Sequence, residues 1–148
     1  MAIEIIPIRG IPEIVPGDDL GVILNRALSG QRLVLHDDDV VVVTQKVISK
    51  SEGRVVPEAP GGKGAWVARE TRRVVARRGD LVVAETRHGF VCANAGVDSS
   101  NVADGYLTLL PEDPDGSAER LRAALSSSTG ARVAVVITDT FGRPWRQG

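Results

Sequence analysis

The sequence predicts a mixed fold of α-helices and β-strands, because two kinds of apolar pattern alternate along its 148 residues. Short β-branched runs such as Val40–Val43 are typical of strands. Helical spacing is shown by Leu20, Ile23, Leu24 and Ala27. A chain of this length fits one domain and can bury a core of its own.

In the first half of the chain, the patterns predict strands over residues 3–8 and 40–43 and helices over residues 20–29 and 65–78. Both predicted strands are β-branched, and the second is apolar on both faces, as in a central strand. Asp19 is a suitable N-cap for the first helix, and Gly30 is suitable to end it. The second helix follows a loop rich in Pro and Gly at 57–64 and has a basic, solvated face.

In the second half, the patterns predict strands over residues 81–86, 90–93, 106–110 and 133–137 and one helix between the last two strands. The first two strands are expected to pair through a turn at His88-Gly89. Asp115–Ser117 is suitable to cap the helix, and Gly130 is suitable to end it. The run Val133–Ile137 predicts a last buried strand.

Composition and charge exclude several classes of function. The 18 basic and 19 acidic residues give a net charge of −1, so no overall field attracts nucleic acid or a membrane surface. Aromatic residues make up only 3%, which argues against a base-stacking surface. One cysteine cannot form an internal disulfide and fits a reducing compartment. Without a long apolar run or a signal peptide, the sequence predicts a soluble, cytoplasmic protein.

Several familiar active-site patterns do not occur in the sequence. The run Gly61–Gly64 lacks the earlier glycine and the following Ser or Thr of a Walker loop. The sequence has neither the glycine fingerprint of dinucleotide-binding folds nor a zinc-ligand spacing. His36 and His88 lie in turn-like surroundings and Cys92 lies within a predicted strand, so no nucleophile–base pair is indicated.

Two polar segments, Asn94–Asn101 and Thr138–Arg143, each follow an apolar run and present oxygen ligands at the end of a strand. Asp98 and Asp139 occupy matching places in them, and their carboxylates suit a divalent cation. We therefore expect the two carboxylates to converge on one cation beside a phosphorylated ligand. Taken singly, an Asx turn at Asp98 and a helix cap at Asp139 are the plainer alternatives.

Two further segments suit an anionic ligand. Residues 44–54 leave a predicted strand and carry Lys46 and Lys50 among hydroxyl groups, which suits phosphate oxygens. The alternative is a solvated strand end with ordinary surface lysines. Gly10–Ile14 is able to fold over a planar ligand, and a plain turn is the alternative there.

Four segments resemble the signature segments of the coenzyme F420:L-glutamate ligase family, in the family's order: Val47–Arg54, Asn94–Val102, Leu110–Ala118 and Ile137–Arg143. The resemblance implies an unusual α+β fold, the gamma-glutamyl ligase fold, with mixed β-sheets and flanking helices. It also implies a homodimer that adds L-glutamate through γ-linkage to the deazaflavin coenzyme F420-0. The co-substrate would be GTP, and the metal would be Mg²⁺ or Mn²⁺.

The resemblance also implies a set of site residues. Binding of GTP is assigned to Ile11, Pro12, Glu13, Ile14, Gln45, Lys46, Lys50 and Asn101. Binding of the metal is assigned to Asp98, Asp139 and Thr140. Gln45 and Lys46 stand where relatives often have small hydroxyl residues, so the role carried over to them is a backbone contact. No catalytic side chain is assigned.

The implied reaction passes through an acyl phosphate. The coenzyme's terminal carboxylate would attack the γ-phosphate of GTP, and the glutamate amine would then displace phosphate. Because the sequence stops in mid-loop after the last motif, residues 1–148 are expected to be the N-terminal portion of one longer ligase domain. A non-catalytic module that binds an anion or a nucleotide, or a purely structural fragment, is the alternative.

Overall fold

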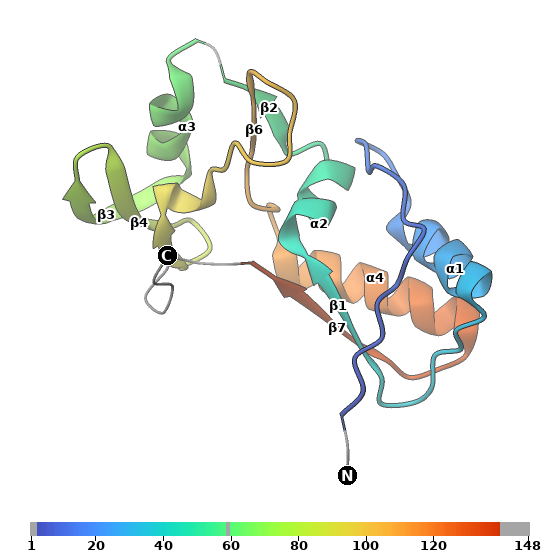
Figure 1. The fold of residues 1–148 in the computed structure, drawn as a ribbon. Helices are drawn as coiled ribbons and strands as arrows, with labels where there is room; N and C mark the ends of the chain where they lie inside the picture. Colours follow the sequence, from blue (N-terminus) through green and yellow to red (C-terminus); the bar gives the residue numbers. More distant parts are fainter. Residues whose placement is uncertain (1–2, 59, 140–148) are drawn as a thin grey trace.

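The structure of the protein is a computed structural model, which describes residues 3–58 and 60–139. Three small β-sheets with helices beside them make up the fold, so the expected α+β class is confirmed (Figure 1). In chain order the elements are α1 (Leu20–Gln31), β1 (Val40–Thr44), α2 (Gln45–Ser51), β2 (Val55–Pro57), α3 (Gly62–Glu70), β3 (Thr71–Arg78), β4 (Leu81–Thr86), β5 (Val91–Ala93), the 3-10 turn η1 (Asn94–Gly96), β6 (Tyr106–Thr108), α4 (Pro114–Thr129) and β7 (Ala134–Thr138).

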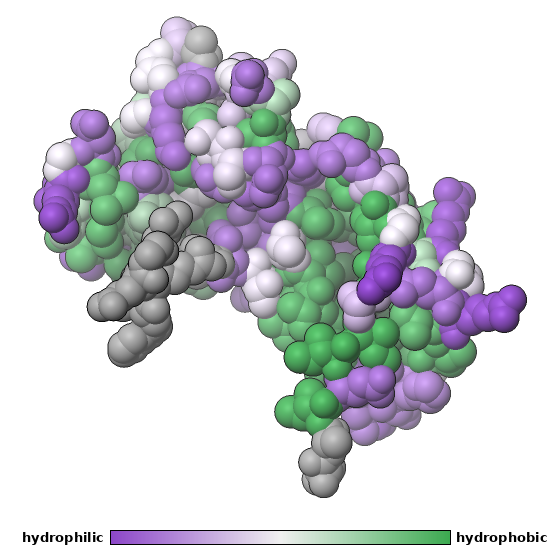
Figure 2. All heavy atoms as spheres, viewed as in Figure 1, coloured by the Kyte–Doolittle hydropathy of each residue, from purple (hydrophilic) through white to green (hydrophobic). Residues whose placement is uncertain are grey.

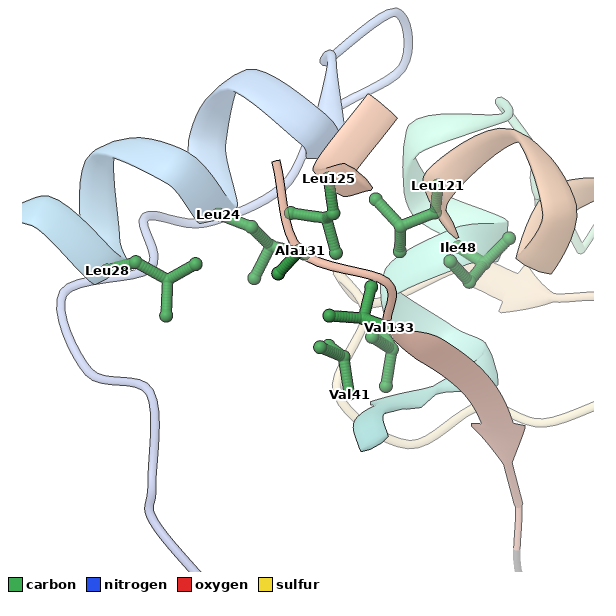
Figure 3. Close-up of a cluster of buried hydrophobic side chains, with 9 residues drawn as sticks. Leu24, Leu28, Val41, Ile48, Leu121, Leu125, Ala131 and Val133 are labelled. Carbon is green, nitrogen blue, oxygen red and sulfur yellow. The ribbon is translucent and has the colours of Figure 1, made fainter. Parts of the chain in front are cut away.

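The first core lies between helices α1 and α4 and the sheet formed by β1 and β7. These two strands are parallel, with Val40 opposite Ala134 and Thr44 opposite Thr138, so their carboxyl ends share one edge. Figure 3 shows leucines of both helices gathered near valines of this sheet region. The buried members are Leu24, Leu28, Val41, Val43, Ile48, Leu121, Leu125, Ala131 and Val133.

The second core is built from the middle of the chain. An antiparallel sheet in the order β3-β4-β5 lies beside α3, and β2 pairs antiparallel with β6. The buried members are Val67, Val82, Ala84, Ala95, Val97, Leu107 and Leu109. Burying a large aliphatic side chain contributes about 1.5–3 kcal/mol, so these clusters account for much of the folding free energy.

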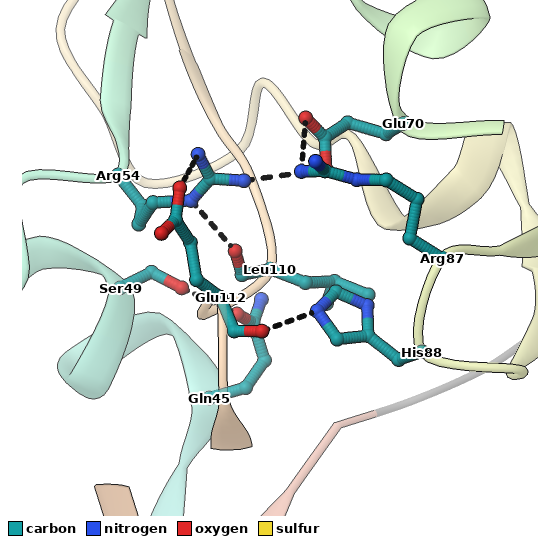
Figure 4. Close-up of polar contacts among 8 residues, drawn as sticks. All are labelled: Gln45, Ser49, Arg54, Glu70, Arg87, His88, Leu110 and Glu112. Atoms are coloured by element: carbon teal, nitrogen blue, oxygen red, sulfur yellow. Dashed lines mark hydrogen bonds and ion pairs between the residues drawn. The ribbon is translucent and has the colours of Figure 1, made fainter. Parts of the chain in front are cut away.

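A polar cluster lies beside the second core and reaches the buried face of α2 (Figure 4). Glu70, at the end of α3, is buried and accepts hydrogen bonds from Arg54 and Arg87 at 3.2 Å each. Arg54 also donates to the carbonyl oxygen of Leu110 at 2.9 Å and lies 3.3 Å from the Glu112 carboxylate. A buried carboxylate held by two guanidinium groups thus ties the end of α3 to the residues just before β2 and just after β4.

Within residues 3–58 and 60–139, one face of the β1–β7 sheet keeps apolar side chains exposed. Along β1 the side chains alternate, with Val41 and Val43 buried and Val40 and Val42 exposed. Figure 2 shows hydrophobic residues on the surface of this side of the molecule. The expected central strand is therefore wrong in one respect, since among the described residues β1 pairs only with β7 and covers only one face.

The expected strand over residues 3–8 is wrong. The segment pairs with no strand of the described chain, and Ile3 and Ile5 are 94% and 90% exposed. Its contacts run to a helix end, because the Gln31 side chain donates to the Pro7 carbonyl oxygen at 3.1 Å and accepts from the Arg9 amide. A β-branched run forms a strand only where a neighbouring backbone pairs with it.

The single helix expected over residues 65–78 is also wrong. Helix α3 ends at Glu70, where the Thr71 hydroxyl donates to the Val67 carbonyl oxygen at 2.6 Å. The rest of the segment is β3, which pairs antiparallel with β4. Most of its side chains are exposed, so backbone pairing with β4 holds this arginine-rich stretch extended.

The helix ends follow the expected capping residues only in part. Asp19 caps α1 by accepting from the Val22 amide at 3.0 Å, as predicted, but the helix passes Gly30 and ends at Gln31. Helix α4 starts at Pro114 with Asp113 as N-cap, earlier than predicted, and ends at Gly130 as predicted. No described helix has the length and hydrophobicity needed to cross a membrane.

The remaining predicted strands form with altered bounds. The β4–β5 pair turns at His88-Gly89 as expected, and Gly89 has the positive φ of +87° that the turn requires. The strand expected at 106–110 is limited to β6, and the loop expected at 57–64 gives way to α3 at Gly62. The last strand, β7, forms as predicted but is only partly buried.

Candidate functional site

Helix α2 carries three of the predicted site residues, Gln45, Lys46 and Lys50. It begins directly after β1, so it starts at the sheet edge where β1 and β7 both end. Lys46 and Lys50 are four residues apart and therefore share one face of the helix. Gln45 and Ser49 lie on its buried side, where the Ser49 hydroxyl donates to the Gln45 side-chain oxygen at 2.8 Å.

Lys46 contacts Asp98 across the boundary between the two cores. Its ammonium lies 2.5 Å from Asp98 Oδ2 and also donates to the hydroxyl and carbonyl oxygens of Ser100 at 2.7 and 3.0 Å. The backbone of Asp98 is paired in both directions with Thr108 of β6, which fixes its position. Two residues of one loop thus surround a single cationic group with oxygen atoms.

The ionisation of Asp98 reflects these contacts. Burial alone would raise the pKa of its carboxyl, but hydrogen bonds from Lys46 and Ser100 outweigh that effect and lower the pKa to about 2. The carboxylate is therefore charged at any physiological pH and is available as a ligand for a cation.

Lys50 contacts the segment Ile11–Ile14, to which the resemblance assigns binding of GTP. Its ammonium pairs with the Glu13 carboxylate, and the side chain of Glu13 is largely exposed. The same segment is tied to α2 by a hydrogen bond from the Gly17 amide to the Ser51 carbonyl oxygen at 2.8 Å. Ile14 is buried, so its apolar side chain anchors the segment.

A left-handed turn directs the chain into Asp98. Asn94, Ala95 and Gly96 have consecutive φ values of +51°, +50° and +76°. The Asn94 side-chain oxygen accepts from the Val82 amide at 3.2 Å, and the Val97 amide donates to the Asn94 carbonyl oxygen at 2.9 Å. Such backbone strain persists only where the surrounding structure enforces it, and it is common beside functional sites.

Comparison with known proteins now identifies the family. The family model described as F420-0:Gamma-glutamyl ligase matches residues 9–65 and 58–148. The chain belongs to this family. It is 41% identical to the coenzyme F420:L-glutamate ligase of Methanothermobacter thermautotrophicus and 42% identical to that of Archaeoglobus fulgidus. Both alignments cover 100% of this chain, but only 66% and 64% of the respective relatives.

A third relative of the same name, from Methanopyrus kandleri, is 39% identical over 100% of this chain and 63% of its own length. The chain therefore spans a little under two thirds of these F420:L-glutamate ligases. Each alignment runs over 165 positions, 17 more than the 148 residues of the chain. The two matches to the family model overlap at residues 58–65, in the connection between β2 and α3.

Of the residues that the resemblance assigns to the metal, Asp98 and Asp139 lie within the described part of the chain. Asp139 directly follows β7, so it lies at the sheet edge where α2 begins, and Thr140 lies outside the described residues. Burial and, secondarily, the charge of Asp139 raise the pKa of the Cys92 thiol to about 11. No cluster of three His, Cys, Asp or Glu side chains suited to a metal occurs within residues 3–58 and 60–139. The convergence of Asp98 and Asp139 stays a prediction.

The oxygens around Lys46 nevertheless fit a hard cation. A carboxylate, a hydroxyl and a main-chain carbonyl are donor types that Mg²⁺ and Mn²⁺ prefer, and here all three contact the Lys46 ammonium. Ser100 was not predicted as a site residue, although it lies in the same polar segment as Asp98, Asn94–Asn101. Asn101 follows it, exposed and in a left-handed conformation with φ of +56°.

The low pKa of Asp98 leads to a testable pH dependence. Because its folded-state pKa of about 2 lies below the ordinary value of 3.8, the carboxylate stabilises the fold above that value. This contribution is lost as the pH falls toward the folded-state pKa. We expect Asp98→Asn to reduce the pH dependence of the free energy of unfolding between about pH 4 and pH 2, measured by urea denaturation. Asp104→Asn, in the same loop but outside the cluster, should behave like the wild type.

Proposed function

We propose that this protein acts as a GTP- and divalent-metal-dependent ligase, or as part of one, that joins L-glutamate through γ-linkage to coenzyme F420-0. One observation carries the proposal. A single face of α2 presents the ammonium groups of Lys46 and Lys50, which suit phosphate oxygens, and Lys46 contacts the carboxylate of Asp98 that is assigned to the metal. Membership of the F420-0:Gamma-glutamyl ligase family supports the same assignment.

The proposed reaction joins a carboxylate to an amine in two steps. A carboxylate oxygen of the coenzyme bonds to the γ-phosphorus of GTP, and GDP leaves to give an acyl phosphate. The glutamate nitrogen then bonds to the acyl carbon, phosphate leaves, and the nitrogen loses a proton to give the amide. Phosphoryl transfer of this kind depends on positioning and charge neutralisation more than on a protein nucleophile.

The chain offers groups for these tasks. Lys46 and Lys50 are compact positive charges on flexible stems, which suits phosphate oxygens. Asp98, Asp139 and Thr140 would hold a divalent cation, which when bound would neutralise phosphate charge. The raised pKa of Cys92 keeps its thiol protonated at neutral pH, which agrees with a reaction that needs no thiolate.

Calorimetry on the full-length protein tests the proposal. We expect GTP to bind more tightly than ATP, and only in the presence of Mg²⁺ or Mn²⁺, because the cation must offset the charge repulsion between phosphates and carboxylates. Asp98→Asn should weaken metal-dependent binding by at least the about 10–100-fold that loss of an outer-shell metal partner costs. Asp104→Asn is the matched control. Equal affinities for GTP and ATP, or binding unaffected by a chelator, would contradict the nucleotide assignment.

A further inference from the structure

The oxygen atoms that surround Lys46 form a cation-binding site, and the ammonium of Lys46 itself occupies it. The ammonium lies 2.5 Å from Asp98 Oδ2, 2.7 Å from Ser100 Oγ and 3.0 Å from the Ser100 carbonyl oxygen. The side chain of Lys46 is only 18% exposed, so the ammonium is held against the loop rather than extended into solvent.

The same oxygens cannot hold an ammonium and a divalent cation together. Mg²⁺ binds oxygen ligands at about 2.0–2.1 Å, so an ion on Asp98 Oδ2 would lie in contact with the lysine head group. The two positive charges would repel each other at that separation, and Ser100 would have to serve both. One of the two cations must therefore leave.

We propose that Lys46 competes with the divalent metal for the oxygens of Asp98 and Ser100, so that metal binding releases its ammonium to contact the phosphates of the nucleotide. This inference rests on the proposed metal role of Asp98. A lysine on a flexible four-carbon stem reorients without movement of the backbone. Once released, Lys46 lies on the same face of α2 as Lys50, one turn away.

The proposed exchange gives the Asp98 carboxylate a cationic partner in both states. In the metal-free protein Lys46 neutralises Asp98 and fixes its carboxylate. In the metal-bound protein the cation takes over that task, and a positive charge becomes available where phosphate binds. Metal and nucleotide would then bind cooperatively, because each favours the conformation with Lys46 released.

Metal affinity in the absence of nucleotide tests the competition directly. Lys46→Met keeps the length and apolar stem of the side chain but removes the competing charge. If the ammonium occupies the site about nine tenths of the time, its removal should tighten Mn²⁺ binding about tenfold, measured from the electron paramagnetic resonance signal of free Mn²⁺. Lys46→Gln is a second variant, and circular dichroism checks that both variants fold.

Lys50→Met is the matched control. It removes the same positive charge one helical turn away, at a lysine whose ammonium pairs with Glu13 and not with Asp98. A general change in the local field would affect both variants alike, whereas competition predicts a large effect only at Lys46. Equal or weaker Mn²⁺ binding in both Lys46 variants would overturn the inference and leave the proposed metal site standing. If neither the wild type nor any variant binds Mn²⁺, the metal site itself is wrong and the inference is wrong with it.

A second measurement separates competition from a structural role. With Mn²⁺ at saturation, we expect Lys46→Met to weaken the binding of GDP to the full-length protein, although the same change tightens Mn²⁺ binding. Opposite effects on the two ligands follow only if Lys46 moves from one to the other. A loss of both affinities would show that Lys46 merely supports the loop of Asp98, and would overturn the proposal.

Discussion

Replacing Gly96 with alanine is expected to destabilise the protein by about 2–5 kcal/mol, the sum of a left-handed backbone penalty and a core clash. Gly96 has a φ of +76°, and a Cβ atom there would lie 2.6 Å from Leu110 Cγ. Leu110 is 4% exposed, so it has no free space into which it can move. The measurement is the free energy of unfolding from urea denaturation.

Gly105→Ala is the matched control for this prediction. Gly105 has nearly the same φ, +78°, but a Cβ atom there would meet nothing within 4 Å. The control therefore retains the backbone penalty of about 1–2 kcal/mol and removes the clash. Equal losses in the two variants would contradict the argument that Leu110 closes this turn and thereby fixes the direction of the chain into Asp98.

Replacing Glu70 with glutamine is expected to lower the free energy of unfolding by about 3–5 kcal/mol, because it leaves the buried charge of Arg54 without its anionic partner. The Glu70 side chain is 7% exposed and pairs with Arg54 and Arg87. Arg54 is itself mostly buried, so water cannot replace the lost carboxylate. The free energy of unfolding in urea again provides the measurement.

Glu112→Gln provides the comparison, because Glu112 pairs with the same arginine at 3.3 Å but its side chain is 73% exposed. Exposed ion pairs contribute about 0–1 kcal/mol, so this change should have little effect. If the two variants lose the same stability, burial does not set the strength of these pairs, and the polar cluster is less important to the fold than its geometry indicates.

The elements that could be predicted from the sequence are those whose signals are local. Asp19 and Gly130 mark helix ends by capping chemistry, and the His88-Gly89 turn joins two strands that are adjacent in sequence. The wrong predictions concern segments whose structure depends on a partner strand elsewhere in the fold. Residues 71–78 form a strand because β4 pairs with them, and residues 3–8 stay unpaired because no described strand lies beside them.

The candidate site, too, was only partly predictable from the sequence. The segments that carry Glu13, Lys50 and Asp98 were recognisable by their resemblance to a family. The pairing of Lys46 with Asp98 was not, because it joins residues 52 positions apart through the placement of α2 against the loop after β5. The buried position of Glu70 likewise depends on Arg54 and Arg87, which lie 16 and 17 positions away in sequence.

The pairing of β1 with β7 has a consequence for the order of events on the ribosome. The first core joins Leu24 and Val41, made early, to Leu125 and Val133, made late, so it cannot close until nearly all of residues 1–138 have emerged. The second core lies between them in sequence, within residues 67–109, and has all of its members sooner. Contacts between residues close in sequence form faster than distant ones. During synthesis, therefore, the middle of the chain is able to form its core while α1 and the valines of β1 still lack their partners from α4 and β7.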